Sequence, residues 1–525
     1  SDVAWPETEP RTDGAFETIV SGGVDVTTVV DTTRLDRSLQ GTLPGLLRED
    51  APGLYFHVEA GITLRELHLL LDLQAPRVAL ATLGGANGQT LAGAIATGTH
   101  GGDFDRPPLA DWVRAIHMIS AGGIEHWIEP ARGITDPSAV RRYFPCIRAE
   151  HIHYDDDLFR AAIVGLGGLG IIYSVILEVV PQYGLAERRV WTDWQSLVPA
   201  VGTDLRGVLD GTRTGLGGPD SATRNRFAEI VVNPYINAAG HNECVVTNRV
   251  ERPEPLERRN RPSAPPTALD PEILAASIEP RIPHGDLHAL ARLGGLVSAA
   301  EREGWSIERR AVELLELAME HDYRWLTAAA IRGVMLRALP AGDRSGVGYE
   351  LMEVASLGSL PTLSVEAAVP LTAGVDLVDR ILRLVGAFAA REHPARRIHV
   401  GGYISLRVCG RTQALLGMQR FDPTAMIEVA VLSGTRGAAE FIDAVQRTAL
   451  DAGAALHWGQ CNSAATRNHM QFYGHDALTR WSRARGTLLR PGGDGLRPGG
   501  DRLREPYLAT FDNALLRRLG LTSTG

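Results

Sequence analysis

Residues 82–102 read TLGGANGQTLAGAIATGTHGG, and this stretch decides the fold. Glycine recurs through it, with threonine and asparagine between the glycines. Glycine lets a backbone approach a ligand closely, and successive N–H groups in such a loop form a concavity that suits a diphosphate. The composition is equally compatible with a glycine-rich turn beneath a packed sheet. The surrounding sequence therefore has to decide between a binding loop and a turn.

A second glycine-rich segment, GLGGLG at 165–170, matches the spacing GxGxxG. A dinucleotide-binding crossover needs a strand before this loop and a helix after it. Here the helical pattern DDDLFRAAIVGL (155–166) comes before the loop, and the β-branched run IIYSVILEVVP comes after it. The order is reversed, so the segment excludes a Rossmann-type NAD site.

The flanking sequence predicts a mixed layer of strands and helices. A helix is expected over 63–74, where Thr63 is a candidate N-cap and Glu66 lies three residues later. Runs rich in valine, isoleucine and aromatic residues predict strands at 26–35, 54–62, 112–123 and 170–182.

The second half predicts a sheet with helices on one face, after a Pro- and Arg-rich loop at 250–285 and a helical region at 286–335. Strands are expected at 349–357, 362–371, 398–408 and 425–434, and helices at 376–391 and 437–452. The predicted fold class is α+β.

The chain of 525 residues has a formal net charge of -9, which argues against nucleic acid or an anionic membrane as a partner. It contains no lysine, so a Schiff-base amine and a lysine-dependent phosphate loop are excluded. The four cysteines have no CxxC spacing. The opening SDVAWPETEP lacks the pattern of a signal peptide, and the apolar run 170–180 is too short to cross a bilayer. These features predict a cytoplasmic protein.

Two segments together resemble a known family. TLAGAIATGTHGG (90–102), followed by LFRAAIVGLGGLGIIYSVILEVVPQY (158–183), is similar to the second half of the FAD domain in the vanillyl-alcohol-oxidase/PCMH superfamily. The nearest likeness is to alditol oxidases and aldonolactone oxidases, and it extends over residues 24–185. The resemblance implies a two-domain PCMH-type FAD-binding fold with a substrate domain of sheet and helices.

The resemblance also implies which residues contact FAD. The flavin and diphosphate would lie against Thr90, Leu91, Ala92, Gly93, Thr97, Gly98, Thr99 and His100. The backbone of Gly170, Ile171 and Ile172 would hold the adenosine side, and Phe511 and Asn513 would return to the flavin domain. The implied FAD-binding domain is 1–190 with 471–525 returning to it, and 191–470 forms the substrate-binding domain.

Short motifs in the second half carry a further resemblance, to alditol oxidases and to the covalent-flavin type of cholesterol oxidase. They are VEAAVP (365–370), ISLRVCGRTQ (404–413) and LHWGQ (456–460). Arg407 is the candidate that stabilises developing negative charge, with a structural ion pair as the alternative. His457 is a candidate proton relay or substrate contact.

The sequence departs from the related sugar oxidases at three of these positions. Ser405 replaces a glutamate, Gln460 replaces a lysine, and Glu428 stands where a histidine is expected. Glu428 or Glu366 is then the candidate base, with a pKa raised by burial.

A fourth departure concerns the loop that carries the family's flavin-linking histidine. Only RTDGA stands where that loop is expected, and the first histidine is His57. The resemblance therefore leaves three alternatives: FAD bound non-covalently, impaired cofactor binding, or a longer natural chain. Non-covalent FAD is the prediction.

The predicted function is hydride transfer from an alcohol carbon of a small molecule to FAD, with O2 or another acceptor reoxidising the flavin. The alternatives are a tailoring flavoenzyme for a larger apolar substrate, and a flavin-free descendant without enzymatic activity. No metal is assigned. The HxHxDD cluster at 151–156 could bind one, but a solvated loop with acids capping the next helix is the favoured interpretation.

Overall fold

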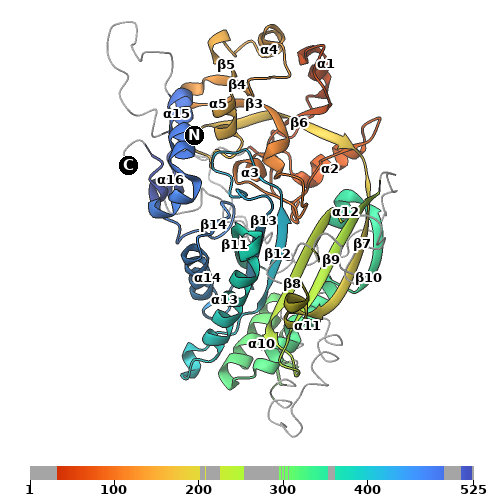
Figure 1. Ribbon diagram of the computed structural model, residues 1–525, viewed down its shortest axis with the longest axis vertical. Coiled ribbons are helices and arrows are strands. Elements are labelled where there is room, and N and C mark those ends of the chain that lie inside the picture. The colour runs from red at the N-terminus through yellow and green to blue at the C-terminus, as the bar shows by residue number, and fades with distance from the viewer. Residues whose placement is uncertain are drawn as a thin grey trace.

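The computed structural model describes residues 32–201, 225–252, 307–352, 361–489 and 510–522, together with residues 207, 292, 295, 296, 298–300 and 302–304. The fold is α+β, as predicted. Its strands form two sheets, which Figure 1 shows one above the other. No helix among these residues is long and apolar enough to cross a membrane.

The first sheet has six strands in the order β1-β6-β3-β4-β5, with β2 paired to β6. Its central strand is the long β6, whose β-branched residues suit a strand buried between two neighbours. The strands are β1 Leu54–Glu59, β2 Val78–Ala79, β3 Val113–Ile119, β4 Glu125–Glu129, β5 Ile152–Tyr154 and β6 Ile171–Pro181.

The second sheet has eight strands in the order β10-β7-β9-β8-β12-β13-β11-β14. Strand β7 begins three residues after β6 ends, so the chain passes from one sheet directly to the other. The strands are β7 Gly184–Asp193, β8 Phe227–Ile236, β9 Asn242–Arg252, β10 Gly342–Val347, β11 Thr362–Pro370, β12 Gly402–Cys409, β13 Thr424–Leu432 and β14 Ala455–Leu456.

We call the first sheet with its helices (residues 32–181) the first unit, and the eight-stranded sheet with its helices the second unit. Local sequence signals determine where the helices of the first unit begin. Helix α2 (Leu64–Asp72) has a capping box between Thr63 and Glu66, as the sequence predicts. The Asp155 side chain caps α5 (Asp156–Ala162) by accepting from the Leu158 N–H at 2.8 Å. The remaining helices here are α1 Leu43–Leu46, α3 Leu91–Ala96 and α4 Pro137–Tyr143, with 3-10 turns η1 Gln40–Thr42, η2 Leu109–Trp112, η3 Ala121–Gly123 and η4 Ala149–His151.

The helices of the second half leave the Arg407 face of the eight-stranded sheet open toward the first unit only at β11–β13, because α11 packs on the same face over β7 and β8. Helices α13 and α14 pack against β11 and β13. A methyl group at Gly374 of α13 would meet Leu406 and Ala425, which lie on the face opposite Arg407. The elements are α6 Trp194–Val201, α10 Ile307–His321, α11 Arg324–Ala338, α12 Gly348–Met352, α13 Leu371–Ala389, η6 Pro394–Arg396, α14 Ala438–Asp451, η7 Arg467–Tyr473, α15 His475–Leu489 and α16 Ala514–Leu519.

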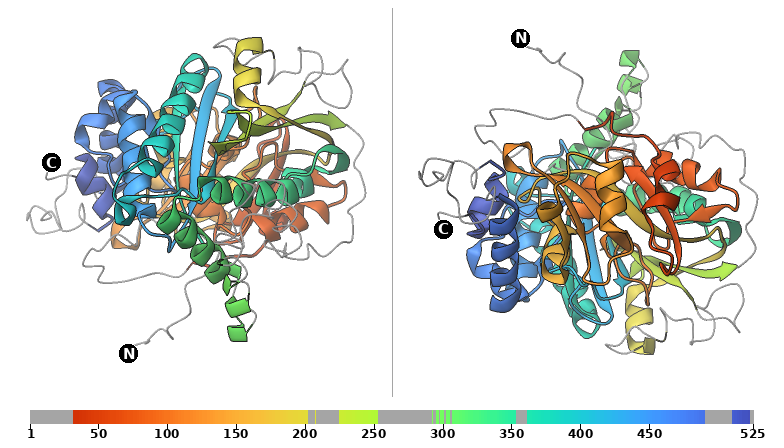
Figure 2. Two further views of the ribbon diagram at one scale, coloured as in Figure 1. Left: turned by 90° about the horizontal axis from the view of Figure 1, so that it is seen from below. Right: turned by 90° about the horizontal axis from the view of Figure 1, so that it is seen from above.

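The C-terminal helices lie along one side of the molecule, where Figure 2 shows them in blue. Helix α15 packs on α5 of the first unit. Its Arg485 Nε donates to the Gly168 carbonyl at 3.1 Å, and the Asn513 amide donates to the Leu166 carbonyl at 3.0 Å. The end of the described chain therefore contacts the loop between α5 and β6.

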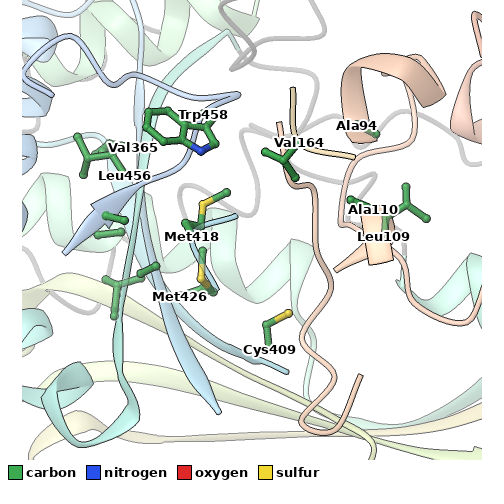
Figure 3. Close-up of a cluster of buried hydrophobic side chains, with 14 of the residues drawn as sticks. Ala94, Leu109, Ala110, Val164, Val365, Cys409, Met418, Met426, Leu456 and Trp458 are labelled. Carbon is green, nitrogen blue, oxygen red and sulfur yellow. The ribbon is translucent and has the colours of Figure 1, made fainter. Parts of the chain in front are cut away.

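One hydrophobic core runs through both units. Figure 3 shows where they meet: Ala94, Leu109, Ala110 and Val164 of the first unit lie on one side, and Cys409, Met418, Met426 and Trp458 of the second unit lie on the other. The Trp458 indole N–H donates to the Leu416 carbonyl at 2.7 Å, so the one polar atom of this large buried side chain has a hydrogen-bond partner. Apolar burial holds the open face of the second sheet against the glycine-rich segment.

Most predicted elements are confirmed, and two are wrong at least in part. Helix α5 precedes 165–170 and strand β6 follows it, which confirms the order that excludes a Rossmann site. The strand expected at 349–357 is instead helix α12 as far as residue 352, and the rest of that range lies outside the described residues. Of the strand expected at 26–35, residues 26–31 lie outside the described part, and residues 33 and 34 form a turn.

Candidate functional site

Four neighbouring strands bring charged side chains to the open face of the second sheet. Glu229 of β8 is paired with Arg407 of β12, Ser405 of β12 with Glu428 of β13, and Glu428 with Glu366 of β11. Directly paired residues share a face, and residues two apart on one strand share it as well. The strand register therefore gathers three glutamates around one arginine.

Arg407 lies at the centre of this cluster. Its Nη2 donates to Glu366 Oε1 at 2.9 Å and to Glu428 Oε2 at 3.4 Å, and its Nε lies 3.9 Å from Glu229 Oε1. Burial opposes the charge of the guanidinium, but the three carboxylates outweigh it and raise the pKa of Arg407. The arginine therefore remains charged in a buried position and offers a positive field there.

Glu366 links Arg407 to the glycine-rich segment. Its Oε2 lies 3.1 Å from His100 Nε2, while His100 Nδ1 lies 2.7 Å from the Gly101 carbonyl oxygen. Because a carbonyl only accepts, Nδ1 donates to it, and Nε2 lies within hydrogen-bond distance of the Glu366 carboxylate. Burial opposes ionisation of Glu366, but His100 and Arg407 outweigh it and lower its pKa. Glu366 is a fixed anion and a poor candidate for the base.

The pKa of Glu428 is shifted in the opposite direction from that of Glu366. Glu428 accepts from Gln460 Nε2 at 3.1 Å and from Ser405 Oγ at 3.4 Å. Burial raises its pKa, Arg407 opposes the rise, and the charges of Glu366 and Glu229 add to it. A carboxylate whose pKa is raised toward neutrality suits proton transfer, so the structure favours Glu428 over Glu366 as the base.

His457 is a buried neutral donor. Its Nδ1 accepts from the Gly459 N–H at 3.0 Å, so the proton of the neutral ring lies on Nε2. Burial lowers the pKa of His457 to about 4. The ring centroid lies 5.9 Å from that of His100, and among the described residues Nε2 has no hydrogen-bond partner. Nε2–H is free to donate to an oxygen of a ligand.

Two members of the cluster were not identified from sequence. Glu229 carries no motif and enters through the β8–β12 pairing alone. Tyr403 lies two residues before Ser405 on β12, so strand alternation could have found it. Burial raises the pKa of Tyr403 well above its usual value, and Glu428 and Glu229 raise it further. The phenol therefore stays protonated beside the carboxylates.

The glycine-rich segment forms the wall opposite the cluster. Thr90 caps α3, and a methyl group at Gly459 would lie 3.0 Å from the Thr97 hydroxyl oxygen, so the wall touches the loop that carries His457. Gly93 is exposed, and Ala92 and Thr97 are partly exposed. Within the described residues, a methyl group at Gly93 would meet nothing nearer than the Thr90 hydroxyl at 3.2 Å. These small residues fit the flat ring of a flavin.

Seven backbone amides in the second half of this segment are already paired inside the protein, so they do not form the backbone cradle expected for a diphosphate. The N–H groups of Leu91 and Ala92 donate to the Ile62 and Ala60 carbonyls, each at 2.8 Å. Further along, N–H groups bond inside the segment as well: those of Gly93, Ala94, Thr97, Gly98 and Thr99. An N–H group already paired inside the protein has no donor left for a phosphate. Diphosphate donors would have to be other amides of this segment or groups elsewhere in the chain.

The predicted adenosine side lies in the first sheet, and so does His57, the first histidine of the chain. Ile171 and Ile172 pair with Ile119 and Met118 in the sheet, and Gly170 before them has φ 152°. His57 is fully buried between the Thr42 and Ser174 hydroxyls, at 3.0 and 3.1 Å. Burial lowers its pKa to about 3. His57 is a structural residue and is not placed to bond a flavin.

Solved structures with a similar arrangement include cholesterol oxidases. A solvent-stable cholesterol oxidase matches 94% of this chain and 85% of its own with a TM-score of 0.53 at 14% identity. Cholesterol oxidase from Brevibacterium sterolicum matches 93% and 84% with a TM-score of 0.56 at 12% identity. The chain has the fold of these cholesterol oxidases. At these identities the likeness concerns the fold, which confirms the fold implied by the glycine-rich motifs.

Sequence relatives of the chain include aldonolactone oxidases. The L-gulonolactone oxidase of Mus musculus is 32% identical over 147 residues, 28% of either chain. The putative D-arabinono-1,4-lactone oxidase of Neurospora crassa is 31% identical over 145 residues, 26% of this chain and 22% of its own. The matched part thus spans about a quarter of these curated relatives. No family model matches the chain.

Proposed function

We propose that the protein is an FAD-dependent oxidoreductase that oxidises a hydroxyl-bearing small molecule. One observation carries the proposal: a buried arginine, a carboxyl group with a raised pKa and a neutral histidine N–H meet opposite an open wall of small residues. The PCMH-type fold and the homologous segment support the cofactor.

Gly93, Ala92 and Thr97 would hold the ring of FAD, and the cofactor would supply a two-electron acceptor. The protein's own residues position the substrate and handle its proton. His457 Nε2–H donates to the reacting oxygen, and ionised Glu428 accepts the hydroxyl proton. Arg407 stabilises the negative charge that grows on that oxygen.

The substrate class is proposed from the relatives and from the polar cluster. Aldonolactone oxidases act on sugar-derived lactones, and the cluster around Glu428 offers both donors and acceptors to such hydroxyl-rich molecules. The neutral residues Ser405 and Gln460 favour a second candidate, a larger and less polar alcohol. O2 or another acceptor would reoxidise the flavin.

The test is the visible absorbance of the purified protein, followed by anaerobic mixing with lactones, polyols and sterols. We expect flavin bands that one of these classes bleaches. A folded, colourless protein that also fails to take up added FAD would refute the proposal and favour a flavin-free descendant. Bleaching by sterols alone would replace the lactone class with the apolar one.

Non-covalent FAD is a second expected result. His57 is buried and hydrogen-bonded, and no described histidine lies on a loop beside the open wall other than His100 and His457, which face the cluster. Acid precipitation should therefore leave the flavin in the supernatant, as measured by its fluorescence. A yellow protein pellet with a colourless supernatant would show that the flavin is covalently linked to the protein.

Replacement of Glu428 by glutamine should remove the acidic limb of the pH dependence of the flavin-reduction rate. Because the pKa of Glu428 is raised, the rate of flavin reduction should fall as the pH drops through that raised value and the carboxylate takes up a proton. Glu428→Gln should be about 10²- to 10⁴-fold slower, with this limb lost. A slow variant that keeps the limb would assign the base elsewhere.

A further inference from the structure

Three histidines meet at the edge of the first sheet, away from the charged face of the second. His126 lies on β4, His153 on β5, and His151 on the 3-10 turn η4 that leads into β5. Strands β4 and β5 run parallel with Ile128 beside His153. The HxH spacing brings together only His151 and His153. The pairing of β4 with β5 adds His126 as the third histidine.

The ring nitrogens are close enough to share one ion. His126 Nδ1 lies 3.0 Å from His153 Nε2, and the His126 ring centroid lies 4.9 Å from that of His151. One nitrogen from each ring lies within 4.8 Å of the other two. Zn–N bonds of about 2.0–2.1 Å place two nitrogens of a tetrahedral site roughly 3.3 Å apart, so the rings need only small movements.

A hydroxyl group orients the most buried of the three rings. Ser120 Oγ lies 2.9 Å from His126 Nε2, on the side away from His153. Histidines that bind metals commonly use the second ring nitrogen for such an outer contact, which fixes the tautomer. A proton on Nε2, donated to Ser120, leaves the Nδ1 lone pair directed at the shared space.

The acids of the HxHxDD motif do not belong to this group. Asp155 caps α5, and Asp156 Oδ1 accepts from the Ala131 N–H at 2.9 Å. The expectation that acids cap the next helix is therefore confirmed, while the histidines converge separately. His126 is buried, and His151 and His153 are partly exposed, which leaves a path from solvent.

We propose that His126 Nδ1, His153 Nε2 and a ring nitrogen of His151 bind one divalent transition metal of the zinc class, with water or an external ligand in the fourth position. Three neutral imidazoles and an open position are a donor set that zinc accepts. The ion would join β5 to β4 at the sheet edge.

Zinc binding to the chelator-treated, tag-free full chain tests this proposal by calorimetry and by metal analysis after dialysis. We expect one zinc per chain. His153→Gln and His151→Gln should abolish the site, and Ser120→Ala should weaken binding by about 10- to 100-fold, the usual loss for an outer partner. His151 is partly exposed, so its variant is expected to fold even if His153→Gln does not.

Two control variants separate this site from others. His393→Gln changes an exposed histidine elsewhere and should leave zinc affinity unchanged. His457→Gln alters a second group of potential metal ligands among the described residues, formed with His100 and Glu366, and should leave the stoichiometry at one. Absence of zinc binding to the parent chain would overturn the proposal. Equal affinity in folded His151→Gln, or loss of the zinc in His457→Gln, would do the same.

Discussion

Arg407→Ala should reduce the rate of flavin reduction by about 10²-fold or more, the usual loss when one stabilising donor is removed from a reacting oxygen. Arg407 is the cation among Glu229, Glu366 and Glu428 on the open face of the second sheet. Without it, negative charge on the substrate oxygen would develop beside uncompensated carboxylates. Stopped-flow reduction under anaerobic conditions measures the effect.

If Arg407 had only a structural role, its variants would give a different pattern of flavin-reduction rates. Arg407→Lys keeps the charge, but one ammonium group cannot reproduce the planar contacts to both Glu366 and Glu428, so we expect partial recovery of the rate. Arg188→Ala, on β7 and paired with exposed Asp343, is the matched control and should reduce flavin at the parent rate. An unchanged rate in folded Arg407→Ala would remove this residue from the chemistry.

The sequence predicts the local parts of this molecule well because they depend on near neighbours. The capping box of Thr63 and Glu66 involves residues three apart, and the reversed helix–loop–strand order at 165–170 needs only the flanking patterns. Arg407, with apolar residues on both sides, was identified because a charge on an apolar strand is costly without a purpose. These inferences require no knowledge of which strands pair.

The remainder depends on strand pairing, which the sequence does not specify. Glu229 joins Arg407 because β8 pairs with β12, across a separation of more than 170 residues. From the sequence, Glu366 and Glu428 are equal candidates for the base. Only the positions of His100 and Arg407 show that the pKa of Glu366 is lowered while that of Glu428 is raised. The paired amides of Leu91 and Ala92 were unpredictable for the same reason, since their acceptors come from the turn after β1.

Glu187→Gln should destabilise the fold by about 3–5 kcal/mol, the range for removing one partner from a buried ion pair. Glu187 of β7 is fully buried and faces three guanidinium groups. Its carboxylate lies 2.9 Å from Arg189 Nε, 2.8 Å from Arg249 Nε and 2.9 Å from Arg344 Nε. A neutral amide would leave the buried cations Arg189 and Arg249 facing each other beside the partly exposed Arg344.

The dependence on pH distinguishes this electrostatic cause from a packing defect. Burial opposes ionisation of Glu187, but Arg249, Arg189 and Arg344 outweigh it and lower its pKa. A lowered carboxyl pKa stabilises the fold above the unfolded-state pKa, and that contribution is lost as the pH falls through the folded-state value. The deficit of Glu187→Gln should therefore be full at neutral pH and narrow in acid.

Thermal melting at several pH values measures this deficit, with Glu178→Gln of β6 as the matched control. Glu178 also pairs with an arginine on a neighbouring strand, at 2.6 Å, but both side chains are partly exposed. Solvent screens such a pair, so its loss should cost no more than about 1 kcal/mol. Equal melting temperatures for the two variants would mean that the three arginines around Glu187 find other partners, and that this carboxylate is not what holds β7, β9 and β10 together.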